Sequence, residues 1–245
     1  MDIWSYQQLI YIVLIFVWTG FVRTGLGFGG AALGLPLLLL IGASPIYWLP
    51  IIATHLLFFT SITFKKNHKN IDTKFLKINL WWIVPPALLG VFGLISFSKN
   101  ALIIFVFSVS LFYSITWIFN KKVQSNNPIL DKFLLVVGGY IAGISLTGAP
   151  LIVAVAMSQV SKINLRNTLF VLWFILVGIK MLTFLYFDIF IDFWFALILL
   201  PFAFIGHIIG LKTHTKIIKN DKIFKRIIGL ALAFVSLLGL IKFLY

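Results

Sequence analysis

The stretch GFVRTGLGFGGAALGLP, Gly20 to Pro36, places an arginine, a threonine and a run of glycines inside otherwise continuous hydrophobic sequence. A weaker copy, GYIAGISLTGAPLIVAV, runs from Gly139 to Val155. When the two copies are aligned at one constant offset, Gly20 matches Gly139 and Gly29 matches Gly148. Two copies indicate an internal duplication. In membrane proteins, glycine-rich breaks at equivalent positions of two halves point to a transport site built from interrupted helices.

The composition predicts an all-α, polytopic membrane protein. Of 245 residues, 61% are hydrophobic and only 11% are charged, and the mean hydropathy is +1.09. Too few charged residues remain to cover the surface of a soluble domain. The net charge of +14 comes from basic residues between the hydrophobic runs, which favours contacts with anionic lipids and not with nucleic acid. The chain has no cysteine, and four scattered histidines do not predict a metal site or cofactor.

The hydrophobic pattern predicts about 8–10 membrane segments, judged against the roughly 20 residues that a spanning helix needs. Three of them are too short for a comfortable crossing and are predicted as half-helices or tight hairpins: 29–42, 133–146 and 148–160. The complete set is 7–26, 29–42, 46–64, 78–97, 101–120, 133–146, 148–160, 168–187, 193–211 and 227–244.

Charge and parity predict the topology. If every segment crosses, the basic clusters at 65–77, 121–132, 162–166 and 212–226 all fall on one side, which the positive-inside rule makes cytoplasmic. Each half then contributes five segments, so the halves enter the membrane in opposite orientations as inverted repeats. A second echo, Pro85-x4-Gly90 against Pro201-x4-Gly206, supports the duplication. We expect one transporter domain over 1–245, with repeat 1 at about 1–122 and repeat 2 at about 130–245.

The two glycine breaks are the candidate substrate-binding site. Glycines let the backbone leave helical pairing and bring its N–H groups close to a ligand, and a half-helix that begins there directs its positive dipole end at the same point. In the second copy, we expect Thr147 to cap the half-helix and Pro150 to occupy its first turn. The candidate residues are Arg23, Thr24, Gly25, Gly27, Gly29, Gly30, His55, Thr147, Gly148, Ala149 and Pro150.

Several of these residues have a second interpretation. Small residues four apart, such as Gly25 and Gly29, also mediate close helix packing. Arg23 either faces the site as a permanent cation or extends to the lipid headgroups near its segment end. His55 either donates to an anion and carries a proton or forms a hydrogen bond between helices, and His207 and Lys180 have the same alternatives. The letters Gly25-x-Gly27-x-x-Gly30 match a dinucleotide motif, but the chain has no strand to precede it.

The six acidic residues suggest how transport is driven. All are aspartates, and none lies well inside a predicted segment: Asp2, Asp72, Asp131, Asp188, Asp192 and Asp221. Many ion-coupled carriers hold a proton or sodium ion on a carboxylate within the membrane. The sequence therefore predicts an uncoupled carrier, which for an anion would act as an exporter.

These motifs resemble those of the TauE/SafE family of sulfite exporters, also called the toluene sulfonate uptake permease family. The resemblance rests on Thr24-Gly25-Leu26-Gly27-Phe28-Gly29-Gly30 with Pro36, the repeat after about 120 residues and the Pro-x4-Gly pairs, and it covers nearly the whole chain. It implies a multi-pass carrier in the bacterial inner membrane for sulfite, sulfonates or related small sulfur-containing or carboxylate anions. Ala149-Pro150 depart from the family pattern, in which further glycines are usual, so the exact substrate stays open.

Three classes of function follow from this sequence. The first is a secondary transporter, predicted as an exporter of a small anion that works by alternating access. The second is an anion channel or a structural membrane subunit, which a unitary conductance would indicate. The third is an intramembrane enzyme, and the chain lacks the nucleophile with a base, the carboxylate pair or the metal cluster that this class needs. The oligomeric state stays open, and a homo-oligomer is compatible with all three.

Overall fold

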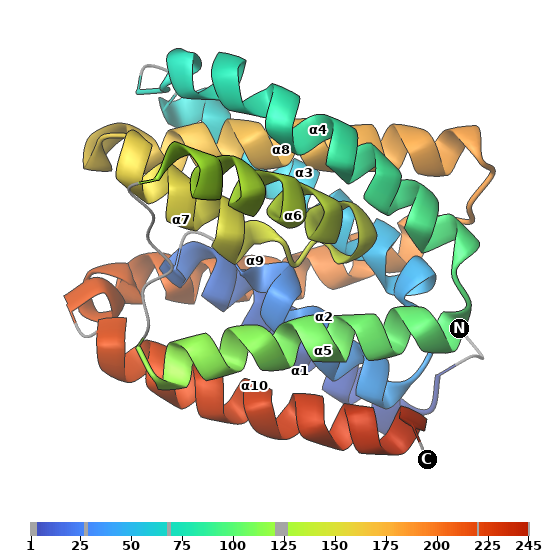
Figure 1. Ribbon diagram of the computed structural model, residues 1–245. Helices are drawn as coiled ribbons and strands as arrows, with labels where there is room; N and C mark the ends of the chain where they lie inside the picture. Colours follow the sequence, from blue (N-terminus) through green and yellow to red (C-terminus); the bar gives the residue numbers. More distant parts are fainter. Residues whose placement is uncertain (1–3, 27–28, 68–69, 121–126, 220, 245) are drawn as a thin grey trace. The chain divides into compact units, whose positions relative to one another are not determined.

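The computed structural model describes residues 4–26, 29–67, 70–120, 127–219 and 221–244. These residues form ten helices and no strand, which confirms the all-α prediction. Figure 1 shows the helices labelled along the chain. Their bounds are α1 Tyr6–Leu26, α2 Gly30–Ile41, α3 Pro45–Asn67, α4 Thr73–Ser96, α5 Lys99–Ile118, α6 Pro128–Ser145, α7 Ala149–Gln159, α8 Lys162–Tyr186, α9 Phe193–Lys219 and α10 Asp221–Leu244.

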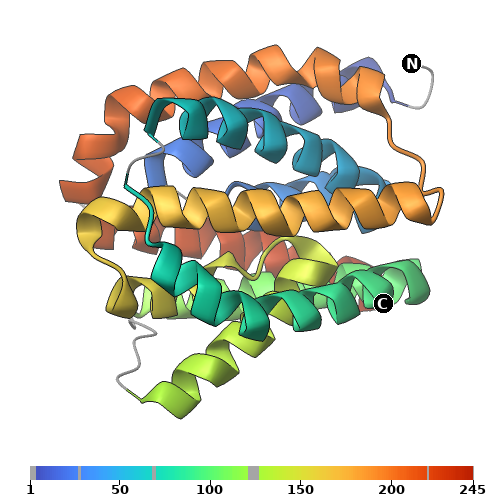
Figure 2. The ribbon, with the colours of Figure 1, turned by 90° about the horizontal axis from the view of Figure 1, so that it is seen from above.

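Eight of these helices are long and apolar enough to cross a membrane, and α2 and α7 are the short ones. Figure 2 shows α8 as a long, uninterrupted helix. The prediction of short segments at 29–42 and 148–160 is confirmed. The prediction for 133–146 is wrong, because α6 begins at Pro128 and is 18 residues long. Asp131 and Lys132 interrupt the hydrophobic pattern near its start, and the Asn127 side chain caps the helix by accepting from the Ile129 N–H at 2.9 Å, so hydropathy alone places its start too late.

Short polar side chains fix where several spans begin. Asp72 accepts from the Phe75 N–H at 2.9 Å at the start of α4, and Asp192 accepts from the Phe195 N–H at 3.0 Å at the start of α9. Ser98 caps α5 in the same way. Each cap satisfies one of the four backbone donors that a helix start leaves without an intrahelical acceptor.

The chain divides into two compact units, and each combines elements from both halves of the sequence. Unit 1 consists of Met1–Trp48, Ser98–Lys121 and Asp192–Tyr245, and unit 2 of Leu49–Phe97 and Lys122–Ile191. Within unit 1, α1 packs most extensively on α9, and α5 packs along α10. Figure 1 shows the latter pair side by side. Within unit 2, the most extensive contact is between α6 and α4.

The same helix crossing is therefore built twice. In each unit the first helix of one half packs on the fourth helix of the other half. In unit 1, Gly20 faces the Ala203 carbonyl and Gly210 faces the Phe21 carbonyl; in unit 2, Gly139 faces the Ile83 carbonyl and Gly90 faces the Tyr140 carbonyl. These residues match pair by pair after about 120 residues, and at each position a side chain would collide with backbone.

The glycine contacts also correct the second echo in the sequence. They align Gly90 with Gly210, and the two aspartate caps, Asp72 and Asp192, align in the same register. The motif match instead pairs Gly90 with Gly206, one helical turn away. Glycines four residues apart lie on the same helix face, so a short motif in a glycine-rich helix slips easily by one turn.

Each short helix runs back along the helix that precedes it. In unit 1, a side chain at Gly34 would collide with Thr19, and the Gln8 Nε2 donates to the Ile41 carbonyl at 3.5 Å, which places the end of α2 beside the start of α1. In unit 2, Gly138 packs on Leu151 of α7. Each half thus contains a helical hairpin whose second arm is only 11 or 12 residues long.

Candidate functional site

The two short helices begin at equivalent positions and lack side-chain caps. The N-cap of α2 is Gly29, with φ +87°, and the N-cap of α7 is Gly148. Gly29 adopts a left-handed backbone conformation that other residues rarely take. The first residues of both helices, Gly30 and Ala149, are buried. Because neither N-cap residue has a side-chain oxygen, the first N–H groups of each helix are left for another acceptor.

The predicted capping role of Thr147 is wrong. Gly148 occupies the N-cap position, and the Thr147 hydroxyl lies 2.6 Å from the Ser145 hydroxyl in a fully buried pair. Ser145 Oγ in turn donates to the Ile141 carbonyl at 3.0 Å. Because the Ser145 hydroxyl proton is used in that bond, the Thr147 hydroxyl donates to Ser145 Oγ. The pair stabilises the end of α6. Pro150 does lie in the first turn of α7, as predicted.

Arg23 lies on α1 beside the first residue of α2. A Cβ added to Gly30 would lie 3.0 Å from the Arg23 Cβ and 3.0 Å from the Thr19 carbonyl, so only glycine lets α2 begin this close to α1. The Arg23 side chain is half-buried. A permanent cation therefore branches from α1 next to a helix N-terminus. This placement agrees with the prediction that Arg23 serves the anion site, and its role stays a prediction.

Thr24 and Gly25 belong to the end of α1. The Thr24 hydroxyl is within 3.0 Å of the Gly20 carbonyl and 2.6 Å of His207 Nδ1 on α9. If the hydroxyl proton goes to Gly20, His207 must carry its proton on Nδ1 and donate it to Thr24. The pair therefore ties α1 to α9 within unit 1. Gly25 lies in the last turn of α1 and is not part of the break, and Gly27 falls outside the described residues.

The candidate residues divide between the two units. Unit 1 holds Arg23, Thr24, Gly25, Gly29 and Gly30, and unit 2 holds His55, Thr147, Gly148, Ala149 and Pro150. His55 is buried on α3, with 3% of its side chain exposed. The meeting of these two groups at one site stays a prediction.

Lys180 is a stronger candidate than its sequence context indicates. It lies on α8 in unit 2, is 1% exposed, and its Nζ has no hydrogen-bond partner among the described residues. Burying an ammonium group without a counter-charge costs several kcal/mol, so such a group is typical of a site that receives an anion. The signal in the sequence is a single lysine inside a 24-residue apolar span.

Asp131 corrects the prediction that no carboxylate lies within a span. It is in the first turn of α6, one of the eight span-length helices, and is 8% exposed. The sequence places it before the hydrophobic run, because the run begins two residues later. A carboxylate in a membrane span is a functional candidate by default, and the prediction of an uncoupled carrier stays a prediction.

No group of three or more His, Asp or Glu side chains that could hold a metal ion occurs in the searched part of the chain. The fold and the site define a multi-pass helical membrane protein whose two half-helices begin at equivalent glycine caps, each followed by a buried first residue.

The model of the sulfite exporter TauE/SafE family matches residues 12–238, and the chain therefore belongs to this family of membrane transporters. The match covers both glycine breaks and nearly the whole chain. No curated protein and no solved structure matches the chain.

Proposed function

We propose that this protein carries a small anion, such as sulfite, a sulfonate or a related organosulfur or carboxylate anion, across the bacterial inner membrane by alternating access. The single observation that carries the proposal is the pair of half-helices, α2 and α7, with buried starts at equivalent glycines. Membership of a family of sulfite exporters supports the choice of substrate class.

The chemistry of a helix start suits an oxyanion. The first N–H groups of α2 and α7 point out of the helix along its axis, and the aligned peptide dipoles place a partial positive charge there. An oxyanion offers several oxygens that can accept from more than one N–H at a time. Each helix start contributes about 0.3–2 kcal/mol to such binding, the higher value applying where water is excluded.

Each unit also holds a cation. In unit 1, Arg23 branches from α1 beside Gly30, and in unit 2, Lys180 lies buried on α8. An arginine keeps its charge in nearly every environment and offers several donors to oxygen atoms. A carrier built in this way would bind its anion through backbone donors and compensate the charge with Arg23 and Lys180.

Alternating access requires two bodies that move relative to each other, and the chain divides into two compact units. Each unit contains one half-helix. An anion channel is the second candidate, because rows of backbone donors and cations also line pores. A structural subunit would need neither the half-helices nor the buried cations.

Thermal stability with a panel of anions tests the substrate class. A ligand that binds only the folded protein stabilises it by about 2.7 kcal/mol at one hundred times its dissociation constant. We expect sulfite or a short sulfonate to raise the melting temperature of detergent-purified protein, and chloride at equal ionic strength to leave it unchanged. Equal shifts with all anions, or none, would contradict a specific oxyanion site.

A further inference from the structure

A buried carboxylate ends a directed hydrogen-bond chain in unit 2. Asn79 on α4 donates through Nδ2 to the Phe75 carbonyl at 3.0 Å and to the Gln159 Oε1 at 3.1 Å. Gln159, the last residue of α7, donates through Nε2 to the Asp131 Oδ2 on α6 at 2.9 Å. The other carboxylate oxygen, Oδ1, is buried and has no hydrogen-bond partner among the described residues. Three helices therefore converge on one incompletely satisfied carboxylate.

The duplication supplies an internal comparison. The glycine contacts and the aspartate caps align α6 with α1, α4 with α9 and α7 with α2. In this alignment Asp131, Asn79 and Gln159 correspond to Ile12, Leu199 and Leu40 of unit 1. Ile12 and Leu199 are 0% and 1% exposed. The fold thus accommodates apolar side chains at these positions, and a buried polar network in their place adds little stability of its own.

None of the described charged groups on the surrounding helices forms an ion pair with Asp131. On α6 itself, the Lys132 Nζ lies over the Trp82 ring at 4.9 Å from its centre. The other titratable group of α6 is Tyr140, and those on the helices packed against α6 are Asp72, Lys74 and Lys77 with α4, and Lys162, Arg166, Lys180 and Tyr186 on α8; α7 has none. Within the described part of the chain, no lysine or arginine forms an ion pair with Asp131.

We propose that Asp131 is the proton-binding site of this carrier and that its proton moves together with the anion. The inference rests on the proposed function and concerns its driving force. A proton fits better than a metal cation, because the group nearest to Oδ2 is the Gln159 amide donor, and a metal ion needs several oxygen ligands at once. Gln159, which binds the buried carboxylate, is itself exposed.

Helix α7 connects the proton site with the predicted anion site. Its last residue binds Asp131, and its first turn, at Ala149 and Pro150, is one of the two half-helix starts. At a rise of about 1.5 Å per residue, the two ends of this helix are roughly 16 Å apart. When Asp131 takes up a proton, its bond from Gln159 changes from a charge-assisted to a neutral one, with roughly half the strength. Protonation therefore loosens one end of the helix whose other end receives the anion.

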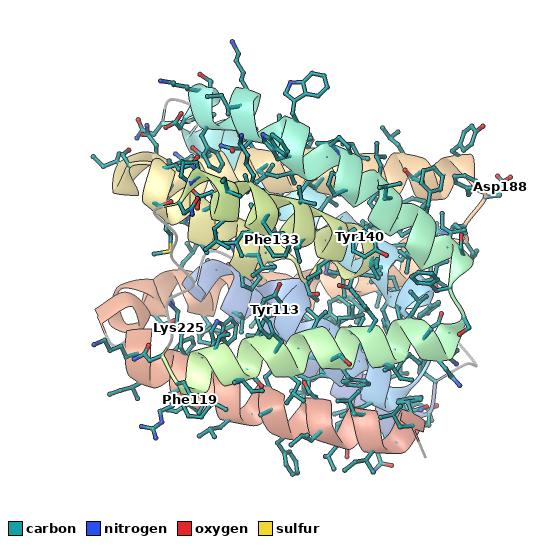
Figure 3. The ribbon with its side chains drawn as sticks, in the orientation of Figure 1. Tyr113, Phe119, Phe133, Tyr140, Asp188 and Lys225 are labelled. Atoms are coloured by element: carbon teal, nitrogen blue, oxygen red, sulfur yellow. The ribbon has the colours of Figure 1, made fainter. Side chains whose placement is uncertain are left out.

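The experiment compares Asp131→Asn with wild type in proteoliposomes, with labelled sulfite and labelled ethanesulfonate as probes. Ethanesulfonate keeps its charge across the pH range, so a pH gradient acts on it only through the protein. Each variant is assayed for exchange of anion at equal pH on both sides, and for accumulation with an acidic outside at a clamped membrane potential. Asp188→Asn is the matched control, because Asp188 is exposed in the loop after α8 and points away from the helices in Figure 3.

We expect wild type and Asp188→Asn to accumulate the anion about tenfold for each pH unit, as one proton per monoanion requires. Asp131→Asn should retain exchange and lose accumulation. The proposal is overturned if Asp131→Asn still accumulates the anion, if it loses exchange in the same proportion, or if a sodium gradient drives wild type and a pH gradient does not. Absence of exchange in wild type would instead contradict the proposed function.

A second variant separates the proton site from a purely structural role. The triple change Asp131→Ile, Asn79→Leu and Gln159→Leu introduces the residues that unit 1 holds at the same places. We expect it to fold, with a melting temperature no lower than that of wild type, and to exchange anions without accumulating them. If it folds and its transport still follows the pH gradient, Asp131 is not the coupling residue.

Discussion

At the residue scale, two buried or half-buried cations carry the account of anion binding. Arg23 branches from α1 beside the start of α2, and Lys180 is buried on α8 without a hydrogen-bond partner among the described residues. The sequence indicates Arg23 because it interrupts a glycine motif. It gives little weight to Lys180, because a lone lysine in a hydrophobic run does not reveal which helix face it occupies. Burial of that face is decided by tertiary packing.

Replacement of Arg23 tests the first cation. We expect Arg23→Ala to abolish anion transport and to leave expression and folding intact, because an anion without its buried counter-charge loses several kcal/mol of binding. Arg23→Lys should restore transport only in part, since lysine supplies one charged point in place of a planar fork. The control is Arg226→Ala, at an exposed position of α10 in the same unit. Normal transport by Arg23→Ala would show that Arg23 is a headgroup anchor.

Replacement of Lys180 tests the second cation through a contrast between stability and function. Removal of a buried, unpaired ammonium relieves a desolvation cost, so Lys180→Met should melt at or above the wild-type temperature. Its apparent affinity for the anion should fall at least about tenfold, which corresponds to about 1.4 kcal/mol. The measurements are thermal denaturation and concentration-dependent flux, with the exposed Lys77→Met as the control. A destabilised variant with unchanged affinity would assign Lys180 to the structure alone.

At the scale of single elements, backbone contacts at glycines define how the helices cross. Gly20 and Gly206 in the α1–α9 contact, and Gly90 and Gly139 in the α4–α6 contact, each face a carbonyl of the opposite helix. The sequence predicts the half-helices at 29–42 and 148–160 correctly, because their shortness and glycine starts are local features. It misplaces the start of α6 because the charged pair Asp131 and Lys132 interrupts the hydrophobic run there, and it misplaces the register of α4 against α9 because the glycines of α9 recur one helical turn apart.

A pair of glycine substitutions tests this packing. We expect Gly206→Ala to lower the stability by about 1–3 kcal/mol, because the added methyl group collides with the Val17 carbonyl on α1. Gly178→Ala is the matched control within a span, since nothing lies within 4 Å of a Cβ added there. It should be neutral or stabilising by up to about 1 kcal/mol, as expected from helix propensity. Equal effects of both changes on thermal denaturation would contradict the close crossing of α1 and α9.

At the scale of the whole molecule, the account depends on the two halves being inverted copies whose half-helices share one site. The duplication itself is visible in the matched contacts of the two units. The parity argument for inversion requires every segment to cross the membrane, and α2 and α7 have only 12 and 11 residues, so inversion and convergence of the two helix starts both stay predictions. Convergence could not be derived from hydropathy, because a hydrophobic segment does not reveal its neighbours.

Cross-linking tests the convergence, and the absence of native cysteine makes it direct. Cysteines introduced at Ala31 and Ala149, in the first turns of α2 and α7, should be joined by a short bifunctional thiol reagent. In the control pair, the second cysteine is introduced at Ile163, at the exposed start of α8, and not at Ala149. This pair should not cross-link. Efficient joining of the control pair with none between Ala31 and Ala149 would place the two helix starts apart.

The most direct test of the central claim is counterflow of labelled sulfite in proteoliposomes. A carrier that alternates between two faces exchanges anion for anion, so vesicles loaded with unlabelled sulfite should take up external label transiently above equilibrium. The account predicts this overshoot for wild type, together with a rate that saturates with sulfite concentration. A linear, non-saturating flux without overshoot, or no flux above protein-free vesicles, would contradict a sulfite carrier.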